Sequence, residues 1–260
     1  MSRLGKNRIL NHTIRRNGII QNVSREEAFK YVHKKLKSII DKYGPESVAV
    51  FGSPKLSNEE LYLLQKFARA GLKTNNISSF SNILYGVELN SLDGMIGLTG
   101  STTSMDSITN ADIIVVLNSN LSEENLVMEL KIKEAQKKGA KLILFSSSEI
   151  RLTKYALEET DIQEAISFSG IDDLKYEMLF QFLKNLNSNI VFIYNIDSTS
   201  DRSVNDIKAV GNFLLLTGRI GKANNGIILL REFNNSTGLM DMGVNPDYLP
   251  GYVKFSEREY

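Results

Sequence analysis

The chain has 260 residues and contains no cysteine, no tryptophan and only two histidines. Without cysteine it can form no disulfide and offers no thiolate to a zinc site or an iron–sulfur cluster. We expect His12 and His33 to be exposed surface residues, because neither has a group of carboxylates near it in the sequence. A Ser-His-Asp triad would have to use one of them, and neither lies near a Gly-x-Ser-x-Gly turn. Composition therefore argues against thiolate, metal and triad chemistry.

A strong net charge and long apolar runs are also missing. The 31 Lys and Arg residues nearly balance the 30 Asp and Glu residues, so nucleic acid is not favoured as a partner. The longest apolar runs, 112–117 and 190–194, have the length of a strand, and we expect no direct membrane insertion. The N-terminus is basic without a continuous apolar stretch, which argues against a signal peptide and leaves an amphipathic targeting segment as the alternative. The expected location is cytoplasmic.

Two Ser-x-x-Glu segments predict helix starts in the first third of the chain. Residues 24–27 precede apolar side chains at the spacing of one buried helix face, and Gly44-Pro45 ends that helix. Residues 57–60 open a second helix, which we expect to end at Gly71 in the left-handed conformation. The apolar face of the first helix consists of Phe29, Val32, Leu36, Ile39 and Ile40.

Short apolar segments with the length of a strand recur between predicted helices. We expect the helices at 123–138, 172–187 and 201–217, with Gly139 ending the first, and loops with short helical pieces over 74–110. Strands that are apolar throughout and alternate with helices form parallel sheets covered on both faces. The predicted fold class is therefore α/β, in the doubly wound style. The strands are expected at 47–53, 112–117, 141–145, 190–194 and 227–230.

Polar residues follow two of the predicted strands in a similar order. Asn118 and Asn120 come after a strand in the middle of the chain, and Asn195 and Asp197 come after a later one. Ligands of open α/β sheets bind beyond the carboxyl ends of the strands, where these four side chains are expected. Turn formation or helix capping is the alternative role for them.

Two glycine-rich segments are only loosely similar to phosphate-binding loops. Residues 97–104, GLTGSTTS, can present backbone N–H groups to a phosphate, and residues 218–226, GRIGKANNG, place a lysine after a glycine. Neither fits Gly-x4-Gly-Lys-Ser/Thr or Gly-x-Gly-x-x-Gly, so neither a nucleotide hydrolase nor a Rossmann-type dehydrogenase is supported. The segment 230–252 is irregular in another way, with three glycines, two prolines and a pair of asparagines.

Several segments together resemble the molybdopterin oxidoreductase family, which includes formate dehydrogenase catalytic subunits and the large iron–sulfur subunit of NADH:quinone oxidoreductase. The resemblance covers nearly the whole chain. It is carried by residues 16–77, which begin RNGIIQNVSREEA, by NADIIVVLNSN and IKEAQKKGAKLIL, and by residues 214–252, LLLTGRIGKANNGIILLREFNNSTGLMDMGVNPDYLPGY. In this family the irregular closing segment passes over the pterin cofactor, which gives a reason for a loop of glycines and amides.

The resemblance implies two Rossmann-like doubly wound parallel-sheet units, one inserted in the other. The outer α/β unit would consist of residues 1–77 and 168–260, and the inserted α/β unit of residues 78–167. Strand 47–53 would then share a unit with the two last predicted strands. Family members are longer, so the chain is expected to be a fragment or a reduced subunit.

The chain departs from the family where the chemistry takes place. Aligned without gaps from Thr74, the family's molybdenum ligand falls on Leu84 and its catalytic histidine on Tyr85. Leucine has no donor atom for a metal, and the proton-transfer partner is missing. Ser146 stands where the family has an aspartate that holds the guanine end of a dinucleotide, and Asn118 stands where it has a glycine. We therefore expect no catalytic residue and no metal ligand in this chain.

The closing segment fits the family pattern better. Glu232 and Phe233 replace the usual glycine and glutamine, while five positions fit the pattern: Asn234, Asn235, Gly238, Asp241 and Gly243. The residues expected to contact a cofactor, or to be remnants of such contacts, are Asn118, Ser119, Asn120, Ser146, Asn195, Asp197, Asn234, Asn235, Gly238 and Asp241.

The resemblance implies a degenerate, non-catalytic domain. It would be a structural subunit or a fragment of a multi-subunit electron-transfer oxidoreductase of formate dehydrogenase, hydrogenase or NADH dehydrogenase type. Fe–S clusters and flavin would be carried by partner subunits, and no cofactor is expected in this chain. The alternative is a module that still binds a molybdopterin guanine dinucleotide, or another nucleotide, in an enzyme completed by other chains.

Overall fold

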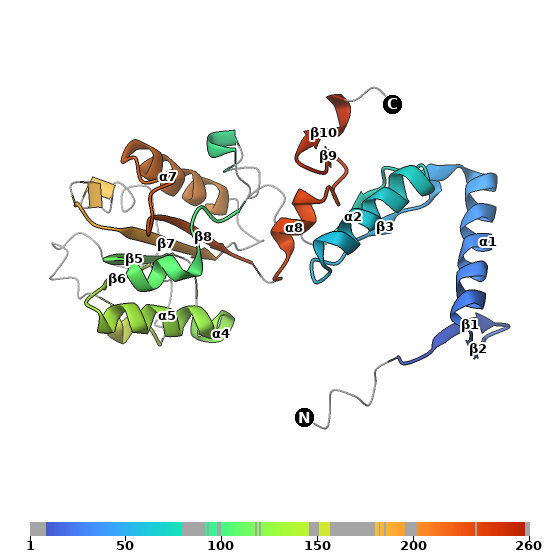
Figure 1. The fold of residues 1–260 in the computed structure, drawn as a ribbon, viewed down its shortest axis with the longest axis horizontal. Helices are drawn as coiled ribbons and strands as arrows, with labels where there is room; N and C mark the ends of the chain where they lie inside the picture. Colours follow the sequence, from blue (N-terminus) through green and yellow to red (C-terminus); the bar gives the residue numbers. More distant parts are fainter. Residues whose placement is uncertain are drawn as a thin grey trace. The chain divides into compact units, whose positions relative to one another are not determined.

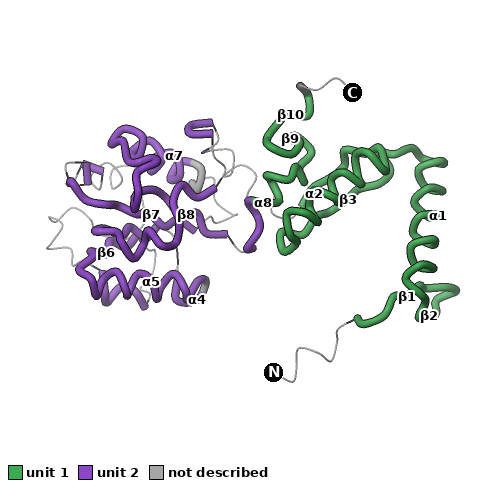
Figure 2. Tube along the Cα trace, in the orientation of Figure 1, with its two compact units in different colours: residues 1–79, 238–260 green, residues 80–237 purple. Residues whose placement is uncertain are grey.

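Contacts divide the chain into two compact units (Figure 2). One consists of Met1–Ser79 and Gly238–Tyr260, and the other of Phe80–Thr237. Across the part of the chain that the structure describes, no helix is long and apolar enough to span a membrane. This computed structural model describes residues 9–79, 92–117 except 93, 98 and 99, 119, 121–145, 151–156, 180–195 except 182 and 185, 202–231 and 233–257.

The second unit is built on a four-stranded parallel sheet with the order β6-β5-β7-β8 (Figure 1). All five residues of β5 are buried, because the strand lies between two neighbours and helices lie on both sides of the sheet. Figure 1 shows α7 on one face and α4 and α5 on the other. The strands are β5 (Ile113–Leu117), β6 (Lys141–Phe145), β7 (Ile190–Asn195) and β8 (Gly226–Leu230), and the helices are α4 (Leu121–Glu124), α5 (Leu126–Lys137) and α7 (Arg202–Leu216).

Side chains of this sheet alternate between two apolar layers. Ile114 and Val116 of β5 share a hydrophobic cluster with Met128 of α5. Phe192 of β7 packs edge to face on Phe213 of α7, with 5.7 Å between the ring centroids. Fully burying a side chain of this size stabilises a fold by roughly 1.5–3 kcal/mol. The sheet and its two helical layers therefore form the core of the second unit.

The first unit consists of two helices and three small sheets. Helix α8 (Ser236–Asp241) contains the point where the chain returns from the second unit to the first. The helices are α1 (Arg25–Tyr43) and α2 (Asn58–Lys66), and α2 continues as a π-helical turn, Phe67–Gly71. The sheets are the antiparallel hairpin of β1 (His12–Arg16) and β2 (Ile19–Val23), the parallel pair of β3 (Val50–Phe51) and β4 (Ile77–Ser78), and the antiparallel pair of β9 (Tyr248–Leu249) and β10 (Val253–Lys254).

Helix starts and strand positions agree well with the sequence-based predictions. Ser57 and Glu60 form the predicted capping box, with hydrogen bonds of 2.9 and 3.3 Å. Ser24 Oγ accepts from Glu27 N at 3.1 Å, while the Glu27 carboxylate accepts from Arg16. Strands β5 to β8 lie where they were predicted, and Gly139, with φ of +101°, ends α5 as expected. The predicted helix 172–187 falls mainly outside the described residues.

Several local predictions are wrong. Gly71 is not left-handed, because the π-helical turn extends α2 and the positive φ, +60°, falls on Lys73. The strand predicted at 47–53 is only two residues long. The β1–β2 hairpin was not predicted, although its turn residues Asn17 and Gly18, with φ of +49° and +81°, are a strong hairpin signal.

Helix α1 has the predicted ends but not the predicted burial. The helix is described throughout, and none of its residues is buried. The predicted apolar face is instead open to solvent, with Phe29 61% exposed and Val32 51% exposed. Amphipathic spacing predicts a face that needs cover, but not what covers it.

The strand grouping implied by the family resemblance is not the one observed. Strands β7 and β8 were expected in one unit with β3, but β7 pairs with β5 along five residues. Strands that are apolar on both faces carry no alternation that would specify their neighbours. The unit boundary expected at residue 78 lies beside Ser79, where the first compact unit breaks, and the one expected at 167 falls outside the described residues.

A buried carboxylate ties α5 to the segment that follows β6. The Glu129 side chain is 0% exposed and pairs with Lys133 and with Arg151, whose Nη2 donates at 2.9 Å. Burial alone raises the pKa of Glu129, but the hydrogen-bonded ion pairs with Lys133 and Arg151 outweigh it, so the pKa lies below its ordinary value. The ionised form is therefore favoured by folding.

Replacing Glu129 with glutamine should lower the free energy of unfolding by about 2–3 kcal/mol at neutral pH, because two cations lose their buried counter-charge. Since the folded-state pKa is depressed, this contribution is present above the unfolded pKa and is lost as pH falls through the folded pKa. Urea unfolding of both proteins between neutral and acid pH measures the difference. The control is Glu134→Gln, which removes an exposed pair with Lys138 and should cost less than about 0.5 kcal/mol. Equal losses of stability in the two variants would contradict the role of Glu129 as the buried, ionised partner of Lys133 and Arg151.

Candidate functional site

The carboxyl ends of the four parallel strands form the first candidate site. Leu117, the last residue of β5, pairs with Phe145 of β6 and with Tyr194 of β7. Asn195 pairs with Leu230, the last residue of β8. The segments that follow all four strands therefore start along one edge of the sheet, where α/β folds bind ligands.

The structure places two of the polar residues predicted for this edge. Ser119 is 5% exposed and lies directly after β5, and Asn195 is half-buried at the end of the neighbouring strand β7. The chain thus brings a hydroxyl and an amide to adjacent strand ends. Six further residues of interest lie outside the described part of the chain, and their roles stay predictions: Leu84, Tyr85, Asn118, Asn120, Ser146 and Asp197.

The glycine-rich segment 97–104 has a structural role in the part that is described. Thr102 N donates to Ile227 O at 2.9 Å, and Thr102 Oγ1 accepts from Ile227 N at 2.9 Å. Ser101 Oγ accepts from Leu229 N at 3.0 Å. These hydroxyls occupy the outer edge of β8, which would otherwise present unpaired backbone groups. The Thr102 N–H that was considered for a phosphate is therefore already used.

The second glycine-rich segment, 218–226, lies at the opposite end of the sheet. Asn225 is 5% exposed, and its Oδ1 accepts from Ile190 N, the first residue of β7, at 2.9 Å. Its Nδ2 donates to Asn189 Oδ1 at 3.0 Å. Asn225 thus fixes the start of β7 beside β8, and the segment has no part in the carboxyl-end site.

Arg69 organises the closing segment in the first unit. Its guanidinium Nη1 donates to Gly243 O, and its Nη2 donates to Asn245 O and Tyr248 O, at distances of 2.7, 2.7 and 3.1 Å. The remaining N–H groups bind the side-chain oxygens of Gln65 and Asn75 at 3.2 and 2.9 Å. All five guanidinium donors are engaged, which is the largest number that an arginine can offer. The fork therefore holds an irregular backbone that has little secondary structure of its own.

The predicted cofactor residues of the closing segment fall in different surroundings. Asn234 is exposed and Asn235 is half-buried, both just before α8, while Gly238 is buried within that helix. Asp241 accepts from the Tyr252 hydroxyl at 2.5 Å, and its backbone oxygen accepts from Gly251 N at 3.0 Å. Asp241 is thus used to fold the segment itself.

Gly243 explains why part of this segment must be glycine. Its φ is +71°, and a Cβ at this position would lie 2.6 Å from Pro250 N and 2.7 Å from the carbonyl carbon of Leu249. Backbone atoms cannot move aside as a flexible side chain can, so any other residue would open the turn. The glycine therefore serves close packing of the segment on itself.

A groove in the first unit lies between α2 and the closing segment. Its volume is about 840 Å³, with Arg69 among its lining residues. Lys66 and Lys73 line it together with the apolar side chains of Leu249 and Phe255. A groove with ammonium groups and apolar walls suits an anionic ligand that also has an apolar part. Among the described residues, no three His, Cys, Asp or Glu side chains gather closely enough to hold a metal ion.

A family model described as molybdopterin oxidoreductase matches residues 8–251. The chain belongs to this family. The resemblance predicted from the sequence is thereby confirmed. The match covers residues of both compact units, including parts of the first unit that lie before and after residues 80–237 in the sequence.

Curated relatives of the chain are named as oxidoreductases or as alpha subunits of oxidoreductases. It is 27% identical over 264 residues to the NADPH-Fe(3+) oxidoreductase subunit alpha of Geobacter sulfurreducens, covering 84% of this chain and 31% of that protein. It is 28% identical to the F420-dependent formate dehydrogenase 1 subunit alpha of Methanococcus maripaludis, covering 92% and 42%. It is 25% identical to formate dehydrogenase H of Escherichia coli, covering 91% and 40%. The molybdopterin oxidoreductase chain thus spans less than half the length of these relatives.

A solved structure supports the fold. The acetylene hydratase of Pelobacter acetylenicus matches with a TM-score of 0.50 and 17% identity, over 93% of this chain and 35% of that one. At this identity the likeness concerns the fold alone. It agrees with an α/β chain built on a parallel sheet, which is the coarse fold class predicted from the sequence.

Three features of the site were missed by sequence reasoning. They are the five-donor role of Arg69, the use of Ser101 and Thr102 along β8, and the buried pairing of Glu129. Backbone oxygens are the partners of Arg69 in the closing segment, and every residue carries one, so no residue pattern marks them.

Replacing Arg69 with lysine should loosen the closing segment, because an ammonium group cannot reproduce five planar donors. We expect the amides of Val244 and Gly251, which are hydrogen-bonded inside the segment, to exchange with deuterium roughly tenfold to hundredfold faster. Amides of β5 should be unaffected. Arg25→Lys is the control, because Arg25 rests on the exposed Phe29 ring. Unchanged exchange rates of the Val244 and Gly251 amides in the Arg69 variant would show that the Arg69 hydrogen bonds do not hold the closing segment.

Proposed function

We propose that this chain is a non-catalytic α/β module of a multi-subunit electron-transfer oxidoreductase. The single observation that carries the proposal is the residue pair Leu84-Tyr85, which falls at the family's metal-ligand and histidine positions when the chain is aligned with the family without gaps from Thr74. A leucine side chain has no lone pair to give to a metal, and tyrosine with its high pKa does not replace histidine as a proton-transfer group near neutral pH. The chain also has no cysteine, and both histidines are exposed.

The residues at the strand ends suit part of the family's cofactor. The donor set at the described strand ends is neutral, with the Ser119 hydroxyl and the Asn195 amide on adjacent strands. Hydroxyls and amides can donate to and accept from the ring and ribose groups of a dinucleotide, but they add no charge. The set therefore fits the polar dinucleotide better than it fits a metal.

A second function is favoured by this donor set. According to this second function, the chain binds a molybdopterin guanine dinucleotide, or another nucleotide, without a metal. Other chains would complete the enzyme. Ser119, Asn195 and Asn235 would contact it, with Asn118, Asn120, Ser146 and Asp197 from the remaining loops. Ser146 weakens this function, because a serine hydroxyl binds a guanine edge less strongly than the family's carboxylate does.

The same proposal assigns roles to the two units of the chain and to its partner subunits. The two compact units, residues 1–79 with 238–260 and residues 80–237, would provide the frame on which Fe–S and flavin-bearing subunits dock in the cytoplasm. Relatives named as alpha subunits support an assembly of several chains. The chain spans 31–42% of the length of those relatives, so their activities come to it only as proposals.

Metal and nucleotide analysis of one preparation tests both functions. The chain is produced in a host that makes molybdopterin guanine dinucleotide and is supplied with molybdate, and a catalytic formate dehydrogenase subunit from the same host is the positive control. We expect less than about one molybdenum or tungsten atom per ten chains by mass spectrometry. A double variant with cysteine at 84 and histidine at 85 shows whether ligand residues alone restore metal binding.

The outcomes separate the two functions. Stoichiometric molybdenum or tungsten in the unmodified chain refutes the non-catalytic proposal. Stoichiometric guanine nucleotide in an acid extract, without metal, selects the second function, and Asn195→Ala should then reduce the nucleotide while Asn110→Ala, in the same unit and exposed, should not. If the preparation contains neither metal nor nucleotide, the result supports a purely structural role.

A further inference from the structure

Helix α1 and the β1–β2 hairpin expose apolar side chains that no part of the described first unit covers. On α1, Phe29 is 61% exposed, Val32 51% and Tyr43 64%. At the hairpin, Ile19 and Ile20 are 65% and 60% exposed, next to the turn. Val32 lies three positions after Phe29, and Tyr43 lies eleven positions, about three helical turns, after Val32, so the three side chains share one face. Exposed apolar surface of this extent on one element marks an interaction site.

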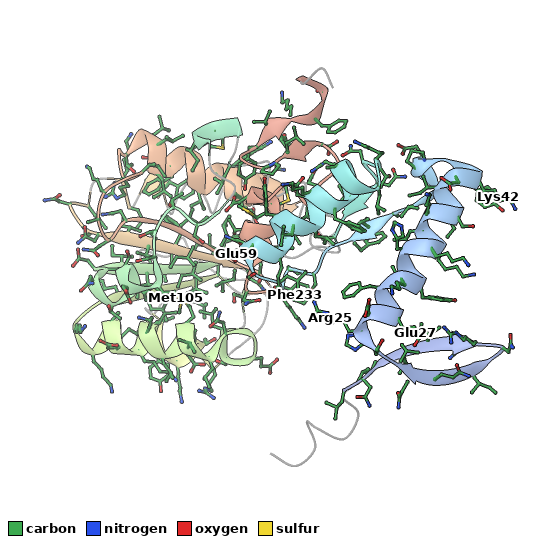
Figure 3. The ribbon with its side chains drawn as sticks, turned by 45° about the vertical axis from the view of Figure 1, so that its right-hand side comes forward. Arg25, Glu27, Lys42, Glu59, Met105 and Phe233 are labelled. Carbon is green, nitrogen blue, oxygen red and sulfur yellow. The ribbon has the colours of Figure 1, made fainter. Side chains whose placement is uncertain are left out.

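The hairpin and α1 together carry a local excess of positive charge. Residues 12–43 contain eight Lys and Arg and three Asp and Glu, a net charge of +5, whereas the whole chain has +1. Figure 3 labels Arg25 and Lys42 near the two ends of α1. The basic residues are Arg15, Arg16, Arg25, Lys30, Lys34, Lys35, Lys37 and Lys42, and the acidic ones are Glu26, Glu27 and Asp41.

Lysines border the apolar face of α1 on both sides. Lys35 and Lys42 lie four residues before and three residues after Ile39, and Lys37 lies three residues before Ile40. Two cations also rest on aromatic rings of this face: the Lys42 ammonium is 4.8 Å from the Tyr43 ring centroid and the Arg25 guanidinium 5.4 Å from that of Phe29. Long basic side chains in this arrangement can keep their charge in water while their stems cover apolar surface.

We propose that α1 and the hairpin bind the surface of an anionic lipid bilayer. A helix with an apolar face, aromatic residues on it and lysines along both borders lies in the plane of the headgroups, with its apolar face toward the acyl chains. Anionic headgroups complement the net charge of +5. A second copy of the chain fits less well, because two such elements would bring the same positive charges together.

This inference goes beyond the proposed function and does not rest on it. Metal and nucleotide content depend on the strand ends and the closing segment, whereas lipid binding depends on residues 12–43. A result that contradicts the proposed function therefore does not contradict the lipid-binding proposal, and the reverse also holds.

Sedimentation of the whole chain with vesicles tests the proposal. We expect binding to vesicles of equal parts phosphatidylglycerol and phosphatidylcholine, no binding to pure phosphatidylcholine, and at least about tenfold weaker binding when salt rises from about 0.1 M to about 0.5 M. Val32→Gln should weaken binding by about tenfold, since it removes an apolar side chain from the bilayer. Leu63→Gln, which changes a side chain 62% exposed on α2, is the matched control and should leave binding unchanged.

Both substituted positions are exposed, so circular dichroism should confirm that both variants fold. Absence of binding to anionic vesicles overturns the proposal, as does an equal loss of binding in the two variants. Light scattering measures whether the chain forms dimers through this face. If the chain forms dimers that Val32→Gln dissociates, and vesicles do not bind, the face is a protein interface and the lipid proposal is wrong.

Discussion

Parallel pairing of β5 with β6 on one side and β7 on the other is the constraint on which the second unit depends. The pairing leaves β5 without an open edge, and the helices on both sides of the sheet leave it without an open face. Five consecutive apolar residues are the only kind of sequence that this position tolerates. The same pairing aligns the strand ends, so that Ser119 and Asn195 start from neighbouring points of one edge. Core stability and the position of the candidate site therefore have one cause.

The closing segment is held by a different kind of interaction. Arg69 reaches three backbone oxygens more than 170 positions away in the sequence and satisfies them with one rigid fork. Gly243 permits the turn that brings those oxygens together, and Tyr252 and Asp241 close the segment further along. An irregular loop that must present its backbone cannot rely on a sheet or a helix for its own hydrogen bonds. A side chain from outside the loop supplies them instead.

Much of the second unit could be predicted from the sequence, and less of the first. Strands β5 to β8 were found because an unbroken run of buried residues leaves a clear apolar signal. Their neighbours were not found, because such a run contains no information about which strand lies beside it. For α1 the periodicity was correct and the burial was not, since the helix face has no cover among the described residues of the first unit. Arg69 could not have been assigned at all, because its partners are carbonyl oxygens common to every residue.

We propose that the α/β frame is stable through its own packing without a bound cofactor. The core of the second unit, the Arg69 clamp and the Glu129 pairing are all made by protein groups alone. Thermal unfolding of the chain from two hosts, one able and one unable to make the pterin dinucleotide, tests this most directly. The account predicts the same midpoint for both within about 1 °C, because a ligand that does not bind adds no stability. A midpoint several degrees higher from the first host would contradict it.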